Sequence, residues 1–208
     1  MRCSKKLVAI LLAVTFVFCI TGCTKKLTRE NFVSELKSYG LEETDKFDVL
    51  TSAMTRRTVI SNYYVAEDED EAEKFGNLTL NKFEVMPELK ANDFVLAVIT
   101  EMGSNNEYYT PFVCFYKFDS DKKAKKTYDN IVETYGDEEY GETGTKSKVT
   151  YYVESGVSAA DTNKIGSGYY LKGDTVIVMR TQSAVDDDYK FVDQLCKKFG
   201  LVSPSTAE

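Results

Sequence analysis

Hydrophobic residues recur along the chain with two different periods, which predict helices in some segments and strands in others. In four segments they return every three to four positions, as on one face of a helix. These segments are residues 28–39, 68–75, 119–135 and 186–199. Each ends on an aromatic residue followed by glycine, at Gly40, Gly76, Gly136 and Gly200. Glycine commonly closes a helix, so we expect the four helices to end at these positions.

The segments between the helices are rich in β-branched and aromatic residues, which favour strands. The expected strands are residues 58–65, 94–101, 112–118, 149–154 and 175–181, with a weaker one at 78–85. Residues 94–101 and 175–181 are apolar at successive positions, so we expect both to lie at the centre of a sheet that is covered on both faces. Residues 103–106 and 172–174 have the composition of hairpin turns.

From Phe112 onward the predicted order is strand, helix, strand, hairpin, helix. This order indicates an α+β fold, in which about four helices pack on one face of an antiparallel sheet. Residues 32–41 are similar to residues 191–201, and residues 63–72 are similar to residues 115–124. The similarity suggests two plait-like (ferredoxin-like) repeats, with halves near 28–106 and 107–202. Coincidence explains it equally well, because both matches use ordinary helix and strand sequences.

The first 23 residues have a different character. Arg2, Lys5 and Lys6 precede an uncharged apolar run at residues 7–20, which is shorter than the roughly 20 residues of a membrane span and typical of a signal peptide. The run ends in Ile20-Thr21-Gly22-Cys23, which resembles the lipobox of bacterial lipoproteins. The alternatives are an ordinary signal peptide or an uncleaved anchor with an incidental cysteine.

The lipobox resemblance implies that residues 1–22 are removed and that Cys23 carries a diacylglycerol. A protein that carries two or more lipid chains, such as those of a diacylglycerol and a palmitate, is anchored stably to a membrane. Residues 23–27 then form a tether that spans at most about 15–18 Å. We expect residues 28–202 to form a domain on the extracytoplasmic face of the cell membrane, followed by a tail at 203–208.

The charge of the mature chain limits its partners. Without the three cations of the signal, 23 of the 26 basic residues remain against 33 acidic residues, a net charge near −10. Such a balance argues against nucleic acid and against broad electrostatic docking on anionic lipid.

The chain contains no histidine, which excludes Ser-His-Asp and Cys-His catalysis, zinc sites with histidine ligands and His-ligated haem. Beyond Cys23, Cys114 and Cys196 are the remaining cysteines of the mature chain, too few for a four-cysteine cluster. We therefore expect no catalytic residue, cofactor or metal. Residues 141–147 superficially match a phosphate-binding loop, but no strand is predicted before them and no helix after them, so we expect a flexible loop.

Cys114 and Cys196 both fall on apolar faces of predicted elements. A disulfide between them is compatible with a location outside the cytoplasm. Two buried free thiols explain the pattern as well, and we favour this second interpretation.

Four Tyr-Tyr doublets, at 63–64, 108–109, 151–152 and 169–170, suggest a binding surface. Neighbours in a strand point to opposite faces, so one tyrosine of a doublet can point outward. Tyr64, Tyr152 and Tyr170 are the candidates for a semi-exposed face that binds a peptide or glycan. The alternative, which we favour, is that a helix or loop covers them.

These observations favour a non-catalytic, membrane-tethered domain that binds a protein, a peptide or an envelope component such as a glycan. A small-ligand receptor that works beside a transporter is the second hypothesis. A hydrolase that uses only carboxylates is the third, although no pair of carboxylates stands out.

The lipobox generates a direct prediction. Protein extracted from membranes should lack residues 1–22 and carry the mass of a diacylglycerol on Cys23, whereas Cys23→Ala should stay unprocessed. Mass spectrometry of the N-terminal peptide checks both. An intact precursor as the main species would contradict the assignment.

Overall fold

The structure is a computed structural model that describes residues 24–56, 58–80, 89–136, 140–157, 163–185 and 187–206. The expected signal peptide and Cys23 lie outside the described residues, as does most of the weak strand predicted at 78–85. Residues 78–80 of that strand are helical instead. None of the helices in the described ranges is long and apolar enough to cross a bilayer.

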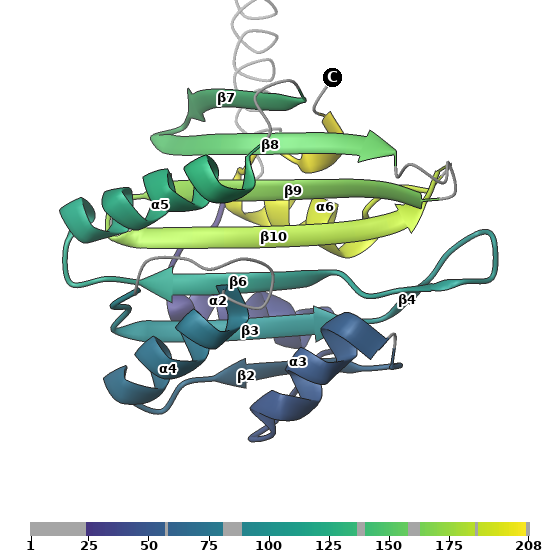
Figure 1. The fold of residues 1–208 in the computed structure, drawn as a ribbon, viewed down its shortest axis with the longest axis horizontal. Helices are drawn as coiled ribbons and strands as arrows, with labels where there is room; N and C mark the ends of the chain where they lie inside the picture. The colour runs from purple at the N-terminus through teal and green to yellow at the C-terminus, as the bar shows by residue number, and fades with distance from the viewer. Residues whose placement is uncertain are drawn as a thin grey trace, which may run out of the picture.

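Eight strands of the described chain form one sheet, in the order β1-β2-β3-β6-β10-β9-β8-β7 (Figure 1). They are β1 (Glu42–Glu43), β2 (Ser61–Val65), β3 (Asp93–Ile99), β6 (Phe112–Lys117), β7 (Gly141–Lys146), β8 (Val149–Val157), β9 (Asn163–Lys172) and β10 (Thr175–Ala184). All neighbours run antiparallel except β1 and β2. A small hairpin pairs β4 (Glu101–Met102) with β5 (Tyr108–Tyr109). The predicted α+β class is confirmed, and β3 and β10 lie inside the sheet as their apolar pattern predicted.

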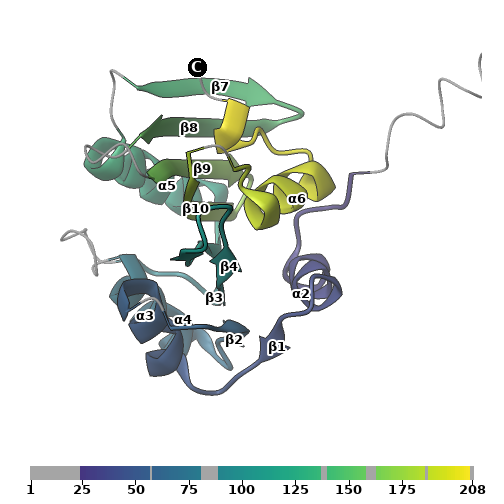
Figure 2. The same cartoon turned by 90° about the vertical axis from the view of Figure 1, so that its right-hand side faces the viewer.

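Helices cover both faces of the sheet, so the expectation that they share one face is wrong. Helices α3 (Phe47–Arg56), α4 (Glu69–Leu80) and α5 (Asp121–Tyr135) lie on one side, which we call the α5 face (Figure 2). Helices α2 (Arg29–Ser38) and α6 (Lys190–Phe199) lie on the other side, the α6 face. The reason is the sequence of the inner strands: Phe94 and Leu96 are fully buried on the α5 face, and Val95 and Ala97 on the α6 face. Both faces therefore need an apolar cover.

Helices α2 and α6 end as predicted. Gly40 and Gly200 adopt positive φ angles of 93° and 67°, which glycine tolerates without steric cost. The next residue closes each helix with a hydrogen bond from its backbone N–H: Leu41 donates to the Leu36 carbonyl (3.1 Å) and Leu201 to the Cys196 carbonyl (2.9 Å). Both helices thus end in the Schellman arrangement.

Two local predictions are wrong, and one helix was not predicted. Helix α4 continues past Gly76, because this glycine serves close packing: a Cβ there would lie 3.0 Å from the Tyr116 ring. Residues 141–146 form the edge strand β7 rather than a loop, and its exposed polar side chains leave no apolar pattern. Helix α3 has no glycine stop in its sequence and was not predicted.

The C-terminal residues are part of the domain rather than a free tail. Pro204–Thr206 form a short 3₁₀ helix, η1, and Pro204 is buried. The hydroxyls of Ser203 and Ser205 donate to the Asp193 carboxylate on α6. Whether the two halves are a duplication stays a hypothesis, although the similar helices α2 and α6 do share one face.

The two cysteines of the domain are free and lie on opposite faces of the sheet. Cys114 on β6 faces the α5 side and Cys196 on α6 packs on the other side, and both are buried. The sheet between them excludes a disulfide in this fold. Burial raises the pKa of each thiol to about 12, so neither forms a thiolate near neutral pH.

Folded, acylated protein should therefore be unreactive toward a maleimide, because Cys23 is blocked by its lipid and the other thiols are buried. Unfolding in guanidinium should release two reactive thiols. Mass spectrometry after labelling with and without denaturant counts them. A linked peptide containing Cys114 and Cys196 would contradict the fold.

Candidate functional site

The three tyrosines expected to form an exposed face do not form one. Tyr64 and Tyr152 point to the α5 face, whereas Tyr170 points to the α6 face. Their side chains are 5%, 3% and 0% exposed. Strand register explains the split, because Tyr170 pairs with Tyr151 rather than with Tyr152. The alternation within each doublet was right, but helices cover both faces.

Each tyrosine instead has a structural partner. The Tyr64 hydroxyl donates to the Glu71 carboxylate at 2.5 Å. The Tyr170 hydroxyl donates to the Val202 carbonyl at 2.7 Å, and its ring packs over Gly168, where a Cβ would lie 2.3 Å from the hydroxyl oxygen. These contacts are internal to the domain.

Tyr152 differs because its hydroxyl reaches toward an open part of the sheet. Its ring stacks on Tyr169 with 5.6 Å between centroids, and a Cβ at Gly136 or Gly141 would collide with it. The hydroxyl donates to the Glu154 carboxylate at 2.8 Å. Tyr152 therefore positions Glu154, which lines a pocket.

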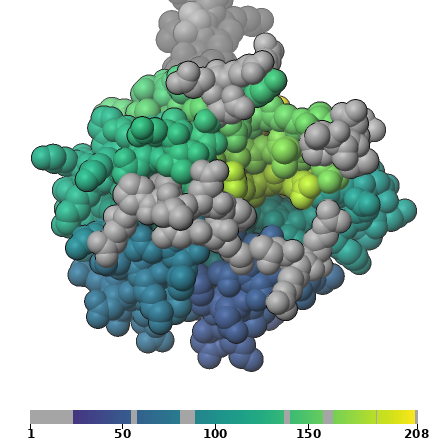
Figure 3. Space-filling model, in the orientation of Figure 1, coloured from purple at the N-terminus to yellow at the C-terminus, as the bar shows by residue number. Residues whose placement is uncertain are grey.

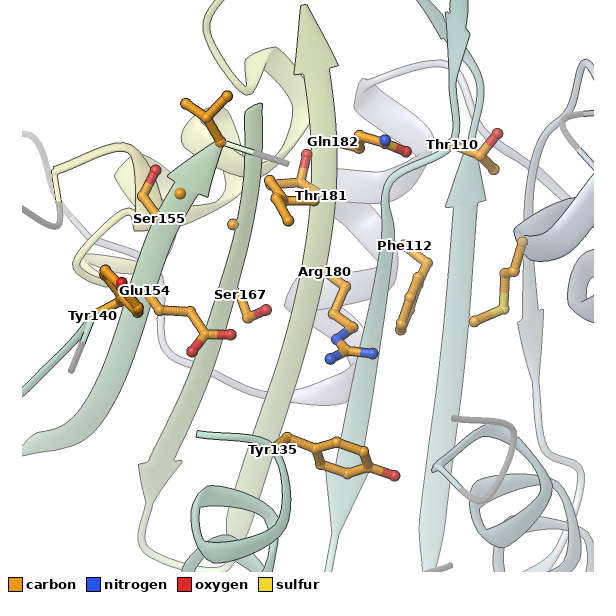
Figure 4. A pocket seen from close by; sticks show the side chains of 15 residues that line it. Thr110, Phe112, Tyr135, Tyr140, Glu154, Ser155, Ser167, Arg180, Thr181 and Gln182 are labelled. Atoms are coloured by element: carbon orange, nitrogen blue, oxygen red, sulfur yellow. The ribbon is translucent and has the colours of Figure 1, made fainter. Parts of the chain in front are cut away.

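The pocket is a hollow of about 820 Å³ on the α5 face, beside the end of α5 and α3. Figure 3 shows the strands at the bottom of this hollow. A row of side chains crosses its floor, one from each of four neighbouring strands: Glu154 on β8, Ser167 on β9, Arg180 on β10 and Phe112 on β6. Each is the direct register partner of the next, and Figure 4 shows the four across the strands. We call these residues the floor row.

The pocket begins where helix α5 ends. The preceding row on the same face consists of Tyr152, Tyr169, Val178 and Cys114, and all four are buried in the core. Tyr135, the last residue of α5, lines the pocket. The helix thus covers one row and leaves the next, polar row open.

The floor row carries two opposite charges. Among the described residues of the lining, Arg180 is the basic one and Glu154 the acidic one. Because β9 separates their strands, their backbones lie about 10 Å apart. The Arg180 guanidinium carbon lies 5.3 Å from the centroid of the Tyr135 ring, a distance typical of a cation–π contact. Aromatic residues therefore position both charges.

Two further hydroxyls lie near the pocket, that of Thr110 in its lining and that of Tyr169 beside Arg180. The Tyr169 and Thr110 hydroxyls are buried and meet no hydrogen-bond partner among the described residues. Burial raises the pKa of Tyr169, and the nearby Arg180 guanidinium opposes that shift. Tyr169 therefore stays protonated at neutral pH, as a hydroxyl beside Arg180.

The mouth of the pocket is apolar. Tyr140, Val157 and Ile165 line it and are 58%, 51% and 46% exposed. Between them lies Gly156, where a Cβ would meet no heavy atom within 4 Å. Exposed apolar side chains around a few polar groups are typical of a ligand site.

Arg180 could have been found from the sequence. In the β10 segment it follows Val176 and Val178 at the alternate positions that face one side of the sheet. A charged residue in that register, on a central apolar strand, signals either a buried charge or a gap in the cover. The tyrosine doublets are more conspicuous in the sequence, but their buried members are structural.

The described part of the pocket contains neither a metal-binding cluster nor a pair of carboxylates. Within the described residues, no group of three or more Cys, Asp or Glu side chains could hold a metal ion. The described lining contains one carboxylate, Glu154, whereas glycoside hydrolysis generally uses two.

Comparisons with known proteins add a weak structural similarity. No protein-family model matches the sequence, and no curated protein matches it. A solved structure, the extracellular domain of PknH from Mycobacterium tuberculosis, is similar with a TM-score of 0.37 and 7% identity. The match covers 53% of this chain and 63% of the PknH chain, so the two share less than two thirds of that domain.

The burial of Tyr170 predicts that this residue stabilises the fold. Tyr170→Ala should lower the free energy of unfolding by about 3–5 kcal/mol, because it opens a cavity and leaves the Val202 carbonyl unpaired. Tyr108→Ala is the matched control, since Tyr108 is 45% exposed and should cost no more than about 0.5 kcal/mol. Urea unfolding measures both, and equal effects would contradict the assigned burial.

Proposed function

We propose that this protein is a membrane-tethered, extracytoplasmic lipoprotein that binds a ligand without catalysis in the pocket beside α3 and α5. The observation that carries the proposal is the floor row, which brings Glu154, Ser167, Arg180 and Phe112 together in an open hollow. Polar and charged side chains are rare on the covered face of a sheet, because burying them without partners costs free energy. Their presence here supports a functional role.

The dimensions and chemistry of the pocket favour a short peptide. Its volume of about 820 Å³ falls within the roughly 300–1,000 Å³ of typical ligand sites. Arg180 suits a carboxylate, which guanidinium groups bind with paired hydrogen bonds. Glu154 suits an amine, and the apolar mouth suits aliphatic or aromatic side chains. A peptide with a free C-terminus, from a partner protein or from the cell envelope, meets all three demands.

A small-ligand receptor is the second candidate function. The same pair of charges also matches a free amino acid, which carries both an amine and a carboxylate. The two candidates share the carboxylate contact and differ in ligand length, so one experiment with ligands of graded length separates them.

The test uses tripeptides with free C-terminal carboxylates, and their C-terminal amides, as probes in ligand-observed NMR. Carboxylate forms should bind more tightly than amides. Arg180→Gln should weaken carboxylate binding about 10–100-fold, the equivalent of one charged hydrogen-bonded pair. Lys122→Gln is the matched control, because it removes the same charge from an exposed position near the start of α5. Single amino acids that bind as well as tripeptides would favour the receptor.

Gly156→Leu provides a steric test. A leucine side chain at this lining position should occupy part of the pocket, and its Cβ would meet no heavy atom within 4 Å. We expect peptide binding to be lost while the thermal midpoint stays close to that of the wild type. Binding that survives Gly156→Leu, or no peptide binding at all, would overturn the proposal.

A further inference from the structure

The first described residues of the chain are attached to the end of helix α6. The Lys25 N–H donates to the Lys198 carbonyl at 3.0 Å. The Thr24 side chain lies over Gly200, where a Cβ would be 2.9 Å from it. Thr24 and Lys25 of the expected tether therefore lie against the end of α6.

A buried carboxylate reinforces this attachment. Glu35 on α2 is 5% exposed, and its carboxylate pairs with the Lys25 ammonium and, at 3.8 Å, with the Lys198 ammonium. A buried carboxylate is stable only with such partners. Glu35 therefore joins the tether, α2 and the end of α6 in one cluster.

Lysines gather around the same point. Lys25 and Lys26 belong to the tether, and Lys197 and Lys198 form the last turn of α6. We call these four residues the anchor patch. Lys26, Lys197 and Lys198 are exposed, and they stand out in a mature chain whose net charge is near −10. A local cluster of this kind attracts anionic lipid headgroups within a Debye length.

We propose that the anchor patch rests on anionic headgroups of the bilayer, with the pocket directed away from the membrane. The proposal assumes the lipid on Cys23 that the proposed function includes. Because consecutive Cα atoms are about 3.8 Å apart, a lipid on Cys23 would be attached one residue before Thr24, which packs on the end of α6. Figure 2 shows the tether on the α6 side of the sheet, whereas α3 and α5, which flank the pocket, lie on the other side.

The orientation can be measured on acylated protein in vesicles that contain phosphatidylglycerol and a lipid with a nitroxide on its headgroup. A fluorophore is attached to Gln194→Cys, one turn before Lys197 on α6, or to Ile165→Cys at the mouth of the pocket. Labelling is selective, since Cys23 is acylated and the other thiols are buried. The label at 194 should be quenched several-fold more than the label at 165. Equal quenching, or stronger quenching at 165, would overturn the orientation.

Two variants test whether the short tether and the lysines of the anchor patch cause this orientation. A flexible Gly-Ser linker of about 20 residues between Cys23 and Thr24, with a mean span of roughly 25 Å, should reduce the difference in quenching. In anionic vesicles, Lys26→Glu combined with Lys197→Glu should reduce the difference in quenching further. In vesicles of phosphatidylcholine alone, the two substitutions should leave the difference in quenching unchanged. A difference that is insensitive to the two substitutions would overturn the contact with anionic headgroups.

Failure of the underlying assumption is recognisable separately. Protein that carries no lipid on Cys23 would not float with the vesicles, whereas a misassigned orientation leaves flotation intact and changes only the quenching. Peptide binding in the pocket is measured independently and does not enter this experiment.

Discussion

The inner strands of the sheet are apolar on both sides, and the remainder of the structure follows from this constraint. Residues of β3, β6 and β10 contribute to a core on each face, so each face requires helices, since apolar surface left in water costs roughly 25 cal/mol per Å². On the α6 face two helices provide the cover, with η1 and the N-terminal tether at their ends. On the α5 face three helices provide it, and α5 stops before the ends of β8, β9 and β10, which continue beyond the floor row. The pocket is the part of the sheet that this cover leaves open.

The elements that could be predicted are those whose sequence carries the pattern of their burial. Residues 112–118 and 175–181 were expected as strands because they are rich in β-branched and aromatic residues, and α5 was expected from its stripe of Ala124, Tyr128 and Ile131. The edge strand β7 and the short helix α3 lacked such a signal. The tyrosine face failed for a different reason: alternation determines which residues share a face, but only the tertiary structure determines what covers that face. For the same reason Arg180 could be placed in register with Val176 and Val178, but the opening above it depends on where α5 ends.

The pocket and the anchor patch lie on opposite sides of one rigid sheet. The contacts that hold the tether against α2 and α6 therefore involve none of the residues that line the pocket. Glu35 with its two lysines serves attachment, and Glu154 with Tyr152 serves the pocket. Glu35 is held by lysines from the tether and from α6, whereas Glu154 is held by Tyr152, two residues before it on the same strand.

The placement of the two buried cysteines has a consequence for the biogenesis of the protein. A secreted chain commonly depends on thiol oxidoreductases to form and rearrange its disulfides before it is native. Here the sheet separates Cys114 from Cys196, and both are sealed in apolar surroundings. The domain can therefore mature without an oxidant, and once folded it offers no thiol for oxidative damage or exchange. Its folding yield should be indifferent to the redox state of its surroundings.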